Sequence, residues 1–539
     1  RTIQSVAERD DGTTSINLDS ALDYSHEGTD PFQGEVALLT RNILFKTELS
    51  GTSEALQQSD VRERKFAHTM YMAGATGNLQ YAEFKFMGHY GILGTYAIHH
   101  HQMLEASRGM IIRGTSGWYN GFRCVNLHIT HGVLVEDNMC YHSSSTAFFV
   151  EQDGTLGFNE DNVFIHNLAI SSRGKKFQDR SDSTIAGEYH RAASFWPGAG
   201  TTNEAFLGNV AASQSKGTGQ AGFHFPELGN SPMSQGVVPF TFVGNEAHGG
   251  QKYGIHSWQN NVPSRDLVDT NLWRNGDLGI NWGAYGNPMK IYNAQLLENG
   301  KKGVDAGSVM TFLQDSTVTG ATIDNSLEDR GFHLASYTHS QPPSHPVWLV
   351  RNTFEDLKTT GILHAENTAC DVTAFLPSIQ ERPMLTGDCS PFYTIEMGNT
   401  FDNVEKDTHF GIQPNPNAFS SIFDYTGIPG LPNDFVLTNR DLLDDPLQQG
   451  VVTKYLVNDQ SFYSSDLDAV VTPMDSLPDT IEFTGLLNQR SLDKQDRSYP
   501  ADFTFTSQAD YPPEVSISVT IDDAARTATI TGAATDDNA

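Results

Sequence analysis

Three consecutive histidines stand at residues 99–101, in the segment Tyr-Ala-Ile-His-His-His that begins at residue 96. Side chains two apart in a β-strand face the same side, so His99 and His101 should project together while His100 faces the other way. If a neighbouring strand places His128 beside this pair, three imidazoles converge. Such a group could bind a transition metal or transfer protons near neutral pH. Alternatively, these histidines are neutral, hydrogen-bonded side chains of a folded wall.

Arg123 and three carboxylates could complete a reactive site around these histidines. Arg123 could neutralise a substrate carboxylate, because a guanidinium group binds a carboxylate through two parallel hydrogen bonds. Alternatively, it points inward and pairs with Asp137 or Glu151. Two carboxylates at a suitable separation could hydrolyse a glycosidic bond, and acidic residues at corners of the chain can equally be solvated or bind calcium. Asp137 and Glu151 are therefore catalytic candidates, and Asp153 is a candidate ligand for calcium or another divalent cation.

Two reactions on a sugar polymer fit these residue types. A lyase needs a cation beside the substrate carboxylate, which Arg123 could supply, and a base, which His99 or His101 could be. Its acid could be a tyrosine. A hydrolase needs two carboxylates instead. We expect aromatic faces and one further cation to hold the substrate, and the candidates are Tyr96, Tyr141, Trp196 and Arg113.

The chain is acidic overall but basic near these residues. Its formal charge of −31 argues against a nucleic-acid-binding protein, since such proteins carry basic surfaces. Residues 41–123 contain nine Lys or Arg and six Asp or Glu, which gives this segment a charge of +3. A basic segment in an acidic chain would attract an anionic polymer, unless its charges are merely scattered over a solvated face.

A short motif recurs along the chain and predicts the elements that position these residues. Apolar residues precede an asparagine, and a small or apolar residue follows it. Spacings of about 24 to 47 residues fit one or two coils of a β-solenoid, in which each coil buries its inner face only when the next coil stacks on it. Asparagine suits the corners, since it tolerates left-handed backbone and can stack from coil to coil. The motif occurs at residues 135–138, 164–167, 206–209, 242–245, 272–275, 296–299, 350–354 and 397–401.

The pattern divides the chain into four parts. Residues 1–35 are expected to be the end of an N-terminal β domain, and 36–405 the solenoid. Residues 406–511, which contain Pro-rich stretches, should form a linker and irregular capping region. The alternating β-branched sequence in 512–539 predicts the start of an immunoglobulin-like β-sandwich module.

Other features favour an exported protein. Four cysteines, at positions 124, 140, 370 and 389, are compatible with two disulfides in an oxidising compartment or with buried thiols; Cys370 and Cys389 could close one loop. No apolar run approaches the roughly 20 residues of a membrane-spanning helix. The sequence begins at Arg1 without an initiator Met or signal sequence and stops in mid-pattern, so we expect it to be a piece of a longer chain.

Five segments resemble the family of the cell-migration-inducing hyaluronidase and the transmembrane hyaluronidase, whose members carry an eight-glycine N-terminal domain. They occur in the family's order and at similar spacing, and weaker similarity continues to about residue 310. One departure is Thr146, where the family has a histidine. The five segments are residues 36–43, 96–101, 123–128, 132–138 and 148–151.

The resemblance implies a right-handed parallel β-helix in an extracellular protein, expected here to be a bacterial relative. It also implies depolymerisation of a glycosaminoglycan or related uronate polymer, with calcium dependence possible. We therefore expect a secreted or cell-surface protein that binds and cleaves an anionic polysaccharide. The alternative is a non-catalytic adhesin or filament protein built on the same β-helix, which the departure at Thr146 would suit.

Overall fold

The computed structural model describes most of the chain up to residue 406 and only separate strands beyond it. The described ranges are residues 1–23, 26–48, 66–89, 92–151, 157–173, 193–197, 203–214, 221–225, 240–258, 265–283, 289–306, 311–321, 329–334, 347–364, 393–397 and 399–406, followed by strands up to residue 531. The chain divides into two compact units, residues 1–39 and 40–539. The first unit contains two antiparallel pairs: β1 (Ile3–Glu8) with β2 (Thr14–Leu18), and β3 (Gly28–Thr29) with β4 (Phe32–Gln33).

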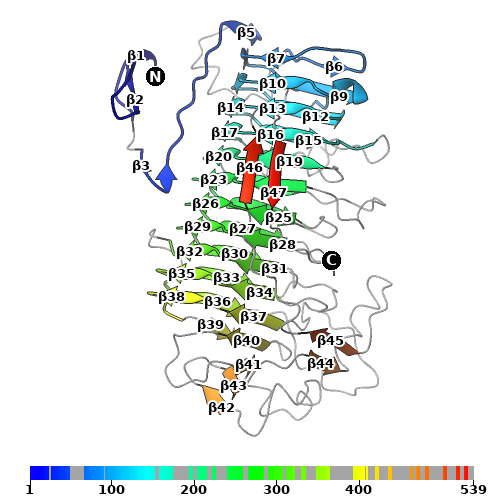
Figure 1. The fold of residues 1–539 in the computed structure, drawn as a ribbon. Helices are drawn as coiled ribbons and strands as arrows, with labels where there is room; N and C mark the ends of the chain where they lie inside the picture. Colours follow the sequence, from blue (N-terminus) through cyan, green and yellow to red (C-terminus); the bar gives the residue numbers. More distant parts are fainter. Residues whose placement is uncertain are drawn as a thin grey trace. The chain divides into compact units, whose positions relative to one another are not determined.

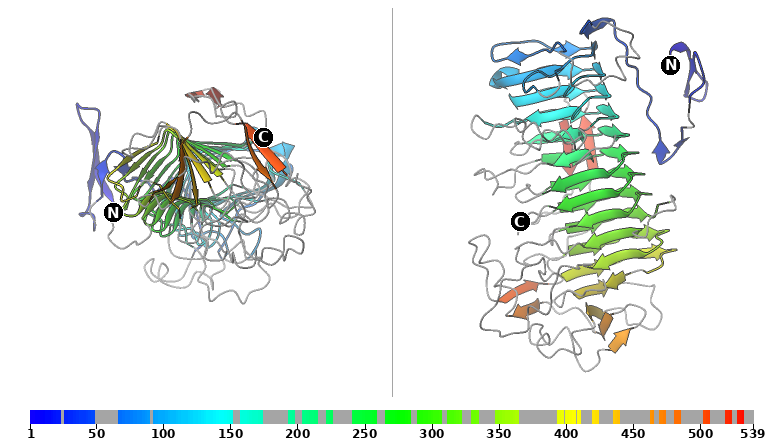
Figure 2. Two further views of the ribbon diagram at one scale, coloured as in Figure 1. Left: turned by 90° about the horizontal axis from the view of Figure 1, so that it is seen from below. Right: turned by 180° about the vertical axis from the view of Figure 1, so that it is seen from behind.

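The second unit contains three long parallel sheets, which run side by side along a stack of coils (Figures 1 and 2). Each coil contributes one strand to each sheet in turn. The first sheet contains β7 (Leu79–Gln80), β10 (Ile111–Arg113), β13 (Leu134–Glu136), β16 (Val163–Ile165), β19 (Glu204–Leu207), β22 (Phe240–Val243), β25 (Arg265–Val268), β28 (Met289–Tyr292), β31 (Thr311–Gln314), β34 (Val347–Val350), β37 (Tyr393–Met397) and β40 (Phe419–Phe423).

The other two sheets follow the same order along the stack. The second contains β5 (Ile43–Lys46), β8 (Ala82–Lys85), β11 (Ser116–Trp118), β14 (Met139–Tyr141), β17 (Leu168–Ile170), β20 (Val210–Ala212), β23 (Glu246–His248), β26 (Asn271–Trp273), β29 (Gln295–Leu297), β32 (Thr317–Thr319), β35 (Thr353–Glu355) and β38 (Thr400–Asp402). The third contains β6 (Tyr71–Met72), β9 (Ile98–Leu104), β12 (Val125–Thr130), β15 (Phe148–Glu151), β18 (Ala193–Trp196), β21 (Ala221–Phe225), β24 (Tyr253–Trp258), β27 (Leu278–Gly283), β30 (Lys302–Ala306), β33 (Arg330–Leu334), β36 (Thr360–His364) and β39 (Thr408–Phe410). This arrangement confirms the parallel β-helix.

Short antiparallel strands follow the parallel stack. The strands β41 (Phe435–Asn439), β43 (Ala469–Pro473) and β42 (Phe462–Ser464) extend the first sheet beyond β40. Two hairpins complete the described part: β44 (Thr480–Thr484) with β45 (Asp502–Thr506), and β46 (Ser518–Asp522) with β47 (Thr527–Thr531). Parallel pairing thus reaches residue 423, past the end expected at 405, while the immunoglobulin-like module stays a prediction.

The corner between the first and second sheets contains the predicted asparagine ladder. At each corner a residue with positive φ, such as Gly208 (φ 58), precedes the inward-pointing side chain. Asn209 donates from Nδ2 to the backbone carbonyl of Phe164 (2.9 Å) and to Oδ1 of Asn245 (3.0 Å). Its own Oδ1 accepts from Nδ2 of Asn167 (2.9 Å). Because all these groups are buried, each asparagine satisfies backbone groups that the turn would otherwise leave without partners.

Two of the eight recurring motifs belong to a different corner. Asn275 and Asn299 lie between the second and third sheets, where they form their own pair (Nδ2 to Oδ1, 3.0 Å). The first corner has Thr270 and Ala294 in the corresponding coils. Both corners combine a left-handed residue with an inward one, so the same local sequence serves either position.

Apolar side chains fill the space between the sheets. On the third sheet Phe148, Phe195 and Phe223 stack with ring centroids 4.8 and 4.9 Å apart. All three are fully buried, and burying one such side chain stabilises the fold by roughly 1.5–3 kcal/mol. Since residues alternate along a strand, the side chains between these positions face away from the core.

A disulfide joins two sheets inside the stack. Cys124, which directly precedes β12, is bonded to Cys140 on β14, and the two are 16 residues apart. One of the two bridges compatible with the sequence is therefore formed. Cys370 and Cys389 lie outside the described residues. In the described part of the chain, no helix is both long and apolar enough to span a membrane.

Candidate active site on the third sheet

The outer side of the third sheet carries a row of polar and aromatic side chains in register. Starting from His99, the positions that pair from strand to strand are Asn126, Phe149 and Trp196. A second row two residues further along contains His101, His128 and Glu151. We call these the outer rows. The two rows place the sequence-predicted histidines and Glu151 on one face within three coils.

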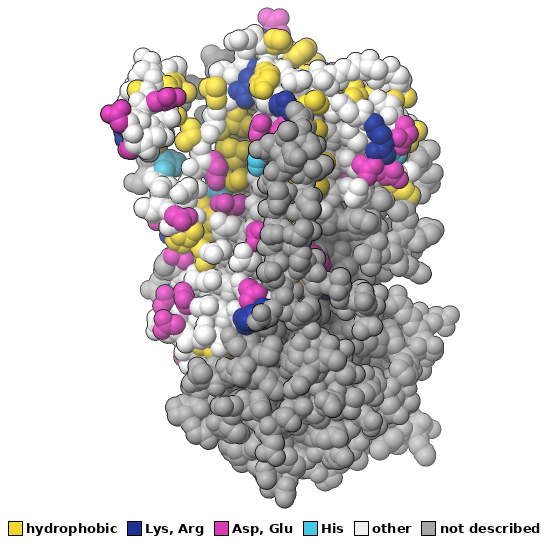
Figure 3. Space-filling view, in the orientation of Figure 1, with side chains coloured by type: hydrophobic (Ala, Val, Ile, Leu, Met, Phe, Trp, Pro, Cys, Tyr) yellow, Lys and Arg dark blue, Asp and Glu magenta, His cyan; other side chains and the backbone are white. Residues whose placement is uncertain are grey.

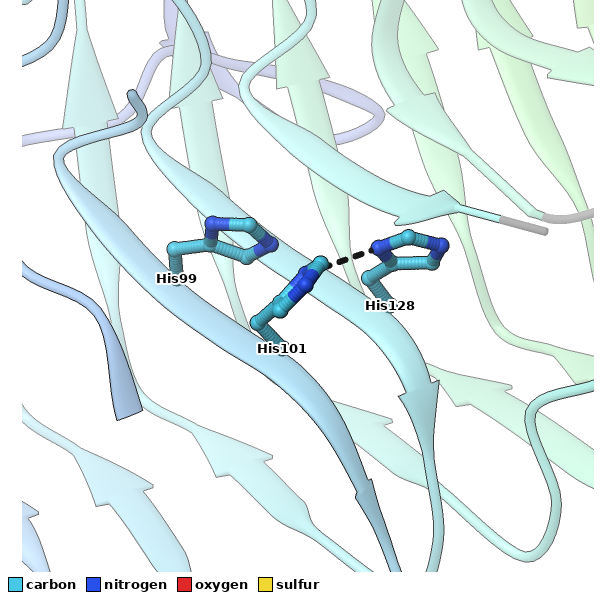
Figure 4. Close-up of side chains that lie close together, drawn as sticks. All are labelled: His99, His101 and His128. Atoms are coloured by element: carbon cyan, nitrogen blue, oxygen red, sulfur yellow. Dashed lines mark hydrogen bonds between the residues drawn. The ribbon is translucent and has the colours of Figure 1, made fainter. Parts of the chain in front are cut away.

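His99, His101 and His128 converge as predicted (Figure 4). One ring nitrogen from each lies within 4.8 Å of the others, and Nδ1 of His128 is 3.0 Å from Nδ1 of His101. His99 is fully buried, whereas His101 and His128 are partly exposed. His100 points to the opposite side of the strand, where its ring stacks on Tyr71 at 4.7 Å. The alternation expected for this segment is confirmed.

The hydrogen bonding of His99 fixes its tautomer. Its Nδ1 lies 2.8 Å from the backbone carbonyl oxygen of Gly94, and an oxygen can only accept, so Nδ1 carries the proton. Burial lowers the pKa of His99 to about 4, against the opposing effects of the Gly94 carbonyl and Glu151. The ring is therefore neutral at pH 7, and its Nε2 presents a lone pair.

A buried ion pair lies one coil further along. Arg123 is fully buried, and its Nη1 lies 3.0 Å from Oε2 of Glu151, 2.8 Å from Oδ1 of Asn126 and 3.0 Å from the hydroxyl of Tyr96. The guanidinium also lies 3.4 Å from the ring centroid of Phe149. Burial acts to raise the pKa of Glu151, but Arg123, His128, Asn126 and His99 together hold it below its ordinary value. Glu151 is thus a carboxylate, fixed in place by Arg123.

This geometry corrects the role expected of Arg123. A fully buried guanidinium that pairs with Glu151 cannot also bind a substrate carboxylate. Arg123 therefore points inward and pairs with Glu151, which was the alternative to substrate binding. Tyr96 is buried as well and donates to Oε1 of Glu151 (3.3 Å), which makes it part of the same cluster and unsuited to direct substrate contact.

Other predicted residues lie away from the histidines. Asp137 is exposed at the first corner, 4.0 Å from His166. Arg113 on the first sheet forms an ion pair with Glu136, and Tyr141 on the second sheet contacts Tyr119. These residues belong to other sheets, so the structure does not bring them to the histidine cluster. Asp153 lies outside the described residues.

Trp196 lies on the first of the two outer rows. The sequence did not predict the polar side chains that follow it on later strands of the third sheet. Its ring lies 4.3 Å from that of His224, whose Nδ1 is 2.9 Å from Nδ1 of His256. Further along, His333 lies 2.6 Å from Asp305, which also contacts Lys302 at 3.3 Å. A signal was available, because Phe223-His224, Ile255-His256 and Phe332-His333 repeat one apolar-histidine pair.

Three arginines of the basic segment lie in ion pairs. Within the described residues, Arg108 forms ion pairs with Glu105 and Asp161, while Arg113 and Arg123 have acidic partners of their own. On the face drawn in Figure 3, basic side chains likewise lie beside acidic ones. The neighbouring carboxylates reduce the attraction that these three arginines would exert on an anionic polymer.

Comparison with known proteins places the histidine cluster in a recognised family of domains. The family model described as "CEMIP beta-helix" matches residues 66–262, which include the histidine cluster, Arg123 and Glu151. Residues 66–262 are therefore similar to the CEMIP β-helix family. The resemblance to the hyaluronidase family that the sequence indicated is thereby confirmed for this part of the chain, while a bacterial source stays a prediction.

Several proteins are similar to this chain over about half its length. A G8 domain-containing protein of Dictyostelium discoideum is 31% identical over 251 residues, which cover 43% of this chain and 20% of the relative. The cell surface hyaluronidase of Danio rerio is 27% identical over 277 residues, covering 44% and 20%. Among solved structures, the surface adhesin PfbA of Streptococcus pneumoniae has a TM-score of 0.36 and 9% identity, covering 69% of this chain and 87% of that one. A likeness of this last degree carries no argument about function.

The match spans only about a fifth of the length of these first relatives. What the CEMIP β-helix itself supplies here is a rigid wall with histidines and a carboxylate held in register on its outer side.

Proposed function

We propose that this is an extracellular protein that binds an anionic polysaccharide along the third sheet and cleaves its glycosidic bonds at His101 and His128. The observation that carries the proposal is the convergence of three imidazoles beside a carboxylate held by a buried arginine. The internal disulfide supports an oxidising, extracellular location. Relatives named as hyaluronidases support a polysaccharide substrate.

The partly exposed pair, His101 and His128, is suited to moving a proton. With their Nδ1 atoms 3.0 Å apart, one ring must donate and the other accept, so a proton can be held by one and released to the other. Glu151 pairs in register with His128 and places its negative charge on the same face of the sheet as the two rings. Arg123, Asn126 and Tyr96 act as positioning residues, since they contact Glu151 or each other and lie buried.

The arrangement argues against two residue assignments that the sequence had suggested for the reaction. A lyase that relies on Arg123 to neutralise the substrate carboxylate does not fit the buried ion pair. A protonated histidine or a bound cation would have to take that role instead. A hydrolase that pairs Asp137 with Glu151 does not fit either, because these residues lie on different sides of the coil.

The full chain should shorten at least one uronate polymer. We would incubate it with hyaluronan, chondroitin, alginate, pectin and ulvan, and follow chain length together with the absorbance of unsaturated uronates. His101→Ala and His128→Ala should each reduce cleavage by about 10²–10⁴-fold, the usual contribution of a proton-transferring side chain. His166→Ala, an exposed histidine at the first corner, is the matched control and should keep full activity.

Binding without cleavage by the unaltered chain would instead support a non-catalytic adhesin. Equal cleavage by the His101→Ala and His128→Ala variants would place the reactive centre elsewhere, and absence of any shortening would exclude depolymerisation of these polymers.

A further inference from the structure

We propose that His99, His101 and His128 together bind one divalent transition-metal ion of the zinc class. This inference goes beyond polysaccharide cleavage, because metal binding can be measured without any substrate. The proton exchange between His101 and His128 belongs to the metal-free chain, since a ring nitrogen that binds the ion carries no proton. It rests on the positions of the three rings, on the hydrogen bonding of His99 and on the chemistry of the donor atoms.

The spacing of the ring nitrogens suits one ion. Zinc–nitrogen distances are about 2.0–2.1 Å, so nitrogens around a common ion lie roughly 3–3.5 Å apart. The Nδ1 atoms of His101 and His128 are 3.0 Å apart, and all three rings offer a nitrogen within 4.8 Å of the others. Small rotations of the side chains would close the remaining gap around an ion.

His99 is prepared as a ligand by its surroundings. A metal-binding histidine commonly donates its other ring N–H to a carbonyl or carboxylate, which orients the ring and leaves the ligating nitrogen unprotonated. His99 does this through Nδ1, which donates to the Gly94 carbonyl. Its Nε2 is buried and has no hydrogen-bond partner among the described residues, which is costly for a polar atom unless something else satisfies it. A metal ion would satisfy this lone pair.

The donor set distinguishes between classes of ion. Three imidazole nitrogens suit zinc, copper or nickel, whereas calcium and magnesium prefer oxygen ligands. The calcium expected from the family resemblance therefore does not fit this cluster. His101 and His128 are partly exposed, which gives an ion a way in and leaves a coordination position open to water or to a substrate oxygen.

A second cluster in the same coils is a weaker candidate. Glu105, His131 and Glu160 also bring three possible ligand atoms within 4.8 Å. Arg108 already supplies a positive charge there, through ion pairs with Glu105 (2.5 Å) and Glu160 (3.7 Å). An ion at this cluster would have to displace the guanidinium. The cluster is nevertheless useful as an internal control for the experiment.

The test is metal binding by the full chain, produced without a histidine tag. After treatment with a chelator and dialysis, the protein would be titrated with Zn²⁺ by calorimetry and with Co²⁺ by visible absorption spectroscopy. We expect one equivalent of metal per chain and, with Co²⁺, ligand-field bands of a low-coordinate nitrogen site. His101→Ala and His128→Ala should each weaken binding by more than the roughly 10–100-fold that loss of an outer hydrogen-bond partner costs.

His131→Gln is the matched control and should keep the full stoichiometry and affinity. Loss of metal in the His131→Gln variant, or unchanged binding in the His101→Ala and His128→Ala variants, would overturn the assignment. So would the absence of stoichiometric binding by the unaltered chain, in which case the short contact is a simple imidazole hydrogen bond. Circular dichroism of each chelator-treated variant separates a lost ligand from a lost fold. Neither outcome depends on whether the chain cleaves a polysaccharide.

Discussion

Glu204 is a carboxylic acid buried within the first sheet. It is 1% exposed, and its Oε1 accepts a hydrogen bond from Nδ2 of Asn162 (2.8 Å), while Oε2 finds no hydrogen-bond partner in the part of the chain that the structure describes. Burial raises the pKa of Glu204 to about 8, an effect to which Asp161 adds and which Asn162 opposes. The folded protein therefore holds a neutral acid at this position under conditions in which the unfolded chain ionises it.

This difference predicts a pH dependence of stability. A pKa raised by folding means that the unfolded chain loses its proton first, at about pH 4.3, so stability falls as the pH rises from there to about 8. The loss should approach about 1.4 kcal/mol per pH unit within this window. Glu204→Gln, which keeps the hydrogen bond to Asn162, should remove this slope in urea denaturation curves measured from pH 5 to 8. An unchanged slope in the variant would mean that Glu204 is ionised in the folded state.

At the residue scale, the sequence predicted which side of a strand a side chain faces better than it predicted which residues that side chain contacts. The strand period was enough to place His99 and His101 on one side and His100 on the other. The partner of Arg123 remained open between Asp137 and Glu151, because that choice depends on which strands lie next to each other. Register between coils separated by segments of varied length cannot be read from local spacing. The same limit hid the contacts of His224 and Asp305.

Asparagines at the first corner join successive coils of the β-helix. Asn209 makes its hydrogen bonds to the coil before it and the coil after it, and all of them are buried. The recurring sequence motif predicted this ladder, because an inward asparagine after a left-handed residue can hydrogen-bond to the same corner of the next coil. It could not tell the first corner from the second, since both corners impose the same backbone requirement.

Removing one member of the ladder should destabilise the protein locally. Asn209→Ala removes the acceptor of the buried Asn167 backbone N–H (3.0 Å) and a donor to the Phe164 carbonyl (2.9 Å), and each buried group left without a partner costs about 1–3 kcal/mol. Thr270→Ala is the matched control at the same corner, because among the described residues its hydroxyl bonds only within its own coil, to the Val268 carbonyl at 3.5 Å. We expect the midpoint of denaturation to fall clearly for the first variant and little for the second. Equal effects would mean that the ladder adds nothing beyond packing.

The whole solenoid is stabilised by the internal disulfide near its N-terminal coils. Because Cys124 and Cys140 are 16 residues apart, the bond closes a short loop in the unfolded chain. Loop-closure entropy for a loop of this size is worth about 3 kcal/mol. The bond also ties the third sheet to the second at the coil that carries His128.

Replacing both cysteines should therefore lower stability without changing the fold. Cys124→Ala with Cys140→Ala should reduce the free energy of unfolding by about 3 kcal/mol, measured by denaturation under oxidising conditions. Reductant should lower the stability of the unaltered protein by a similar amount. The variant keeps Cys370 and Cys389, so any further effect of reductant on it would report a second bridge. No loss in the variant would show that packing alone holds this coil together.

At the scale of the molecule, the stacking of coils could be predicted, whereas the site could be predicted only in outline. Repeated apolar residues before asparagine are sufficient for a parallel solenoid, because few other folds reuse one corner so often. The site needed three strands from separate coils in a defined register. The sequence supplied its histidines, but their distances depend on the whole stack.

Variation in length along this chain spares one corner of each coil. The connections from the first sheet to the second are one or two residues long throughout, whereas those before and after the third sheet vary: residues 171–192 lie between β17 (Leu168–Ile170) and β18 (Ala193–Trp196), and residues 365–392 lie between β36 (Thr360–His364) and β37 (Tyr393–Met397). The long segments therefore border the third sheet, the sheet that carries His101 and His128. Such segments can be accommodated without disturbing the asparagine corner that keeps the coils aligned. The protein thus combines one invariant corner with variable borders around its histidines.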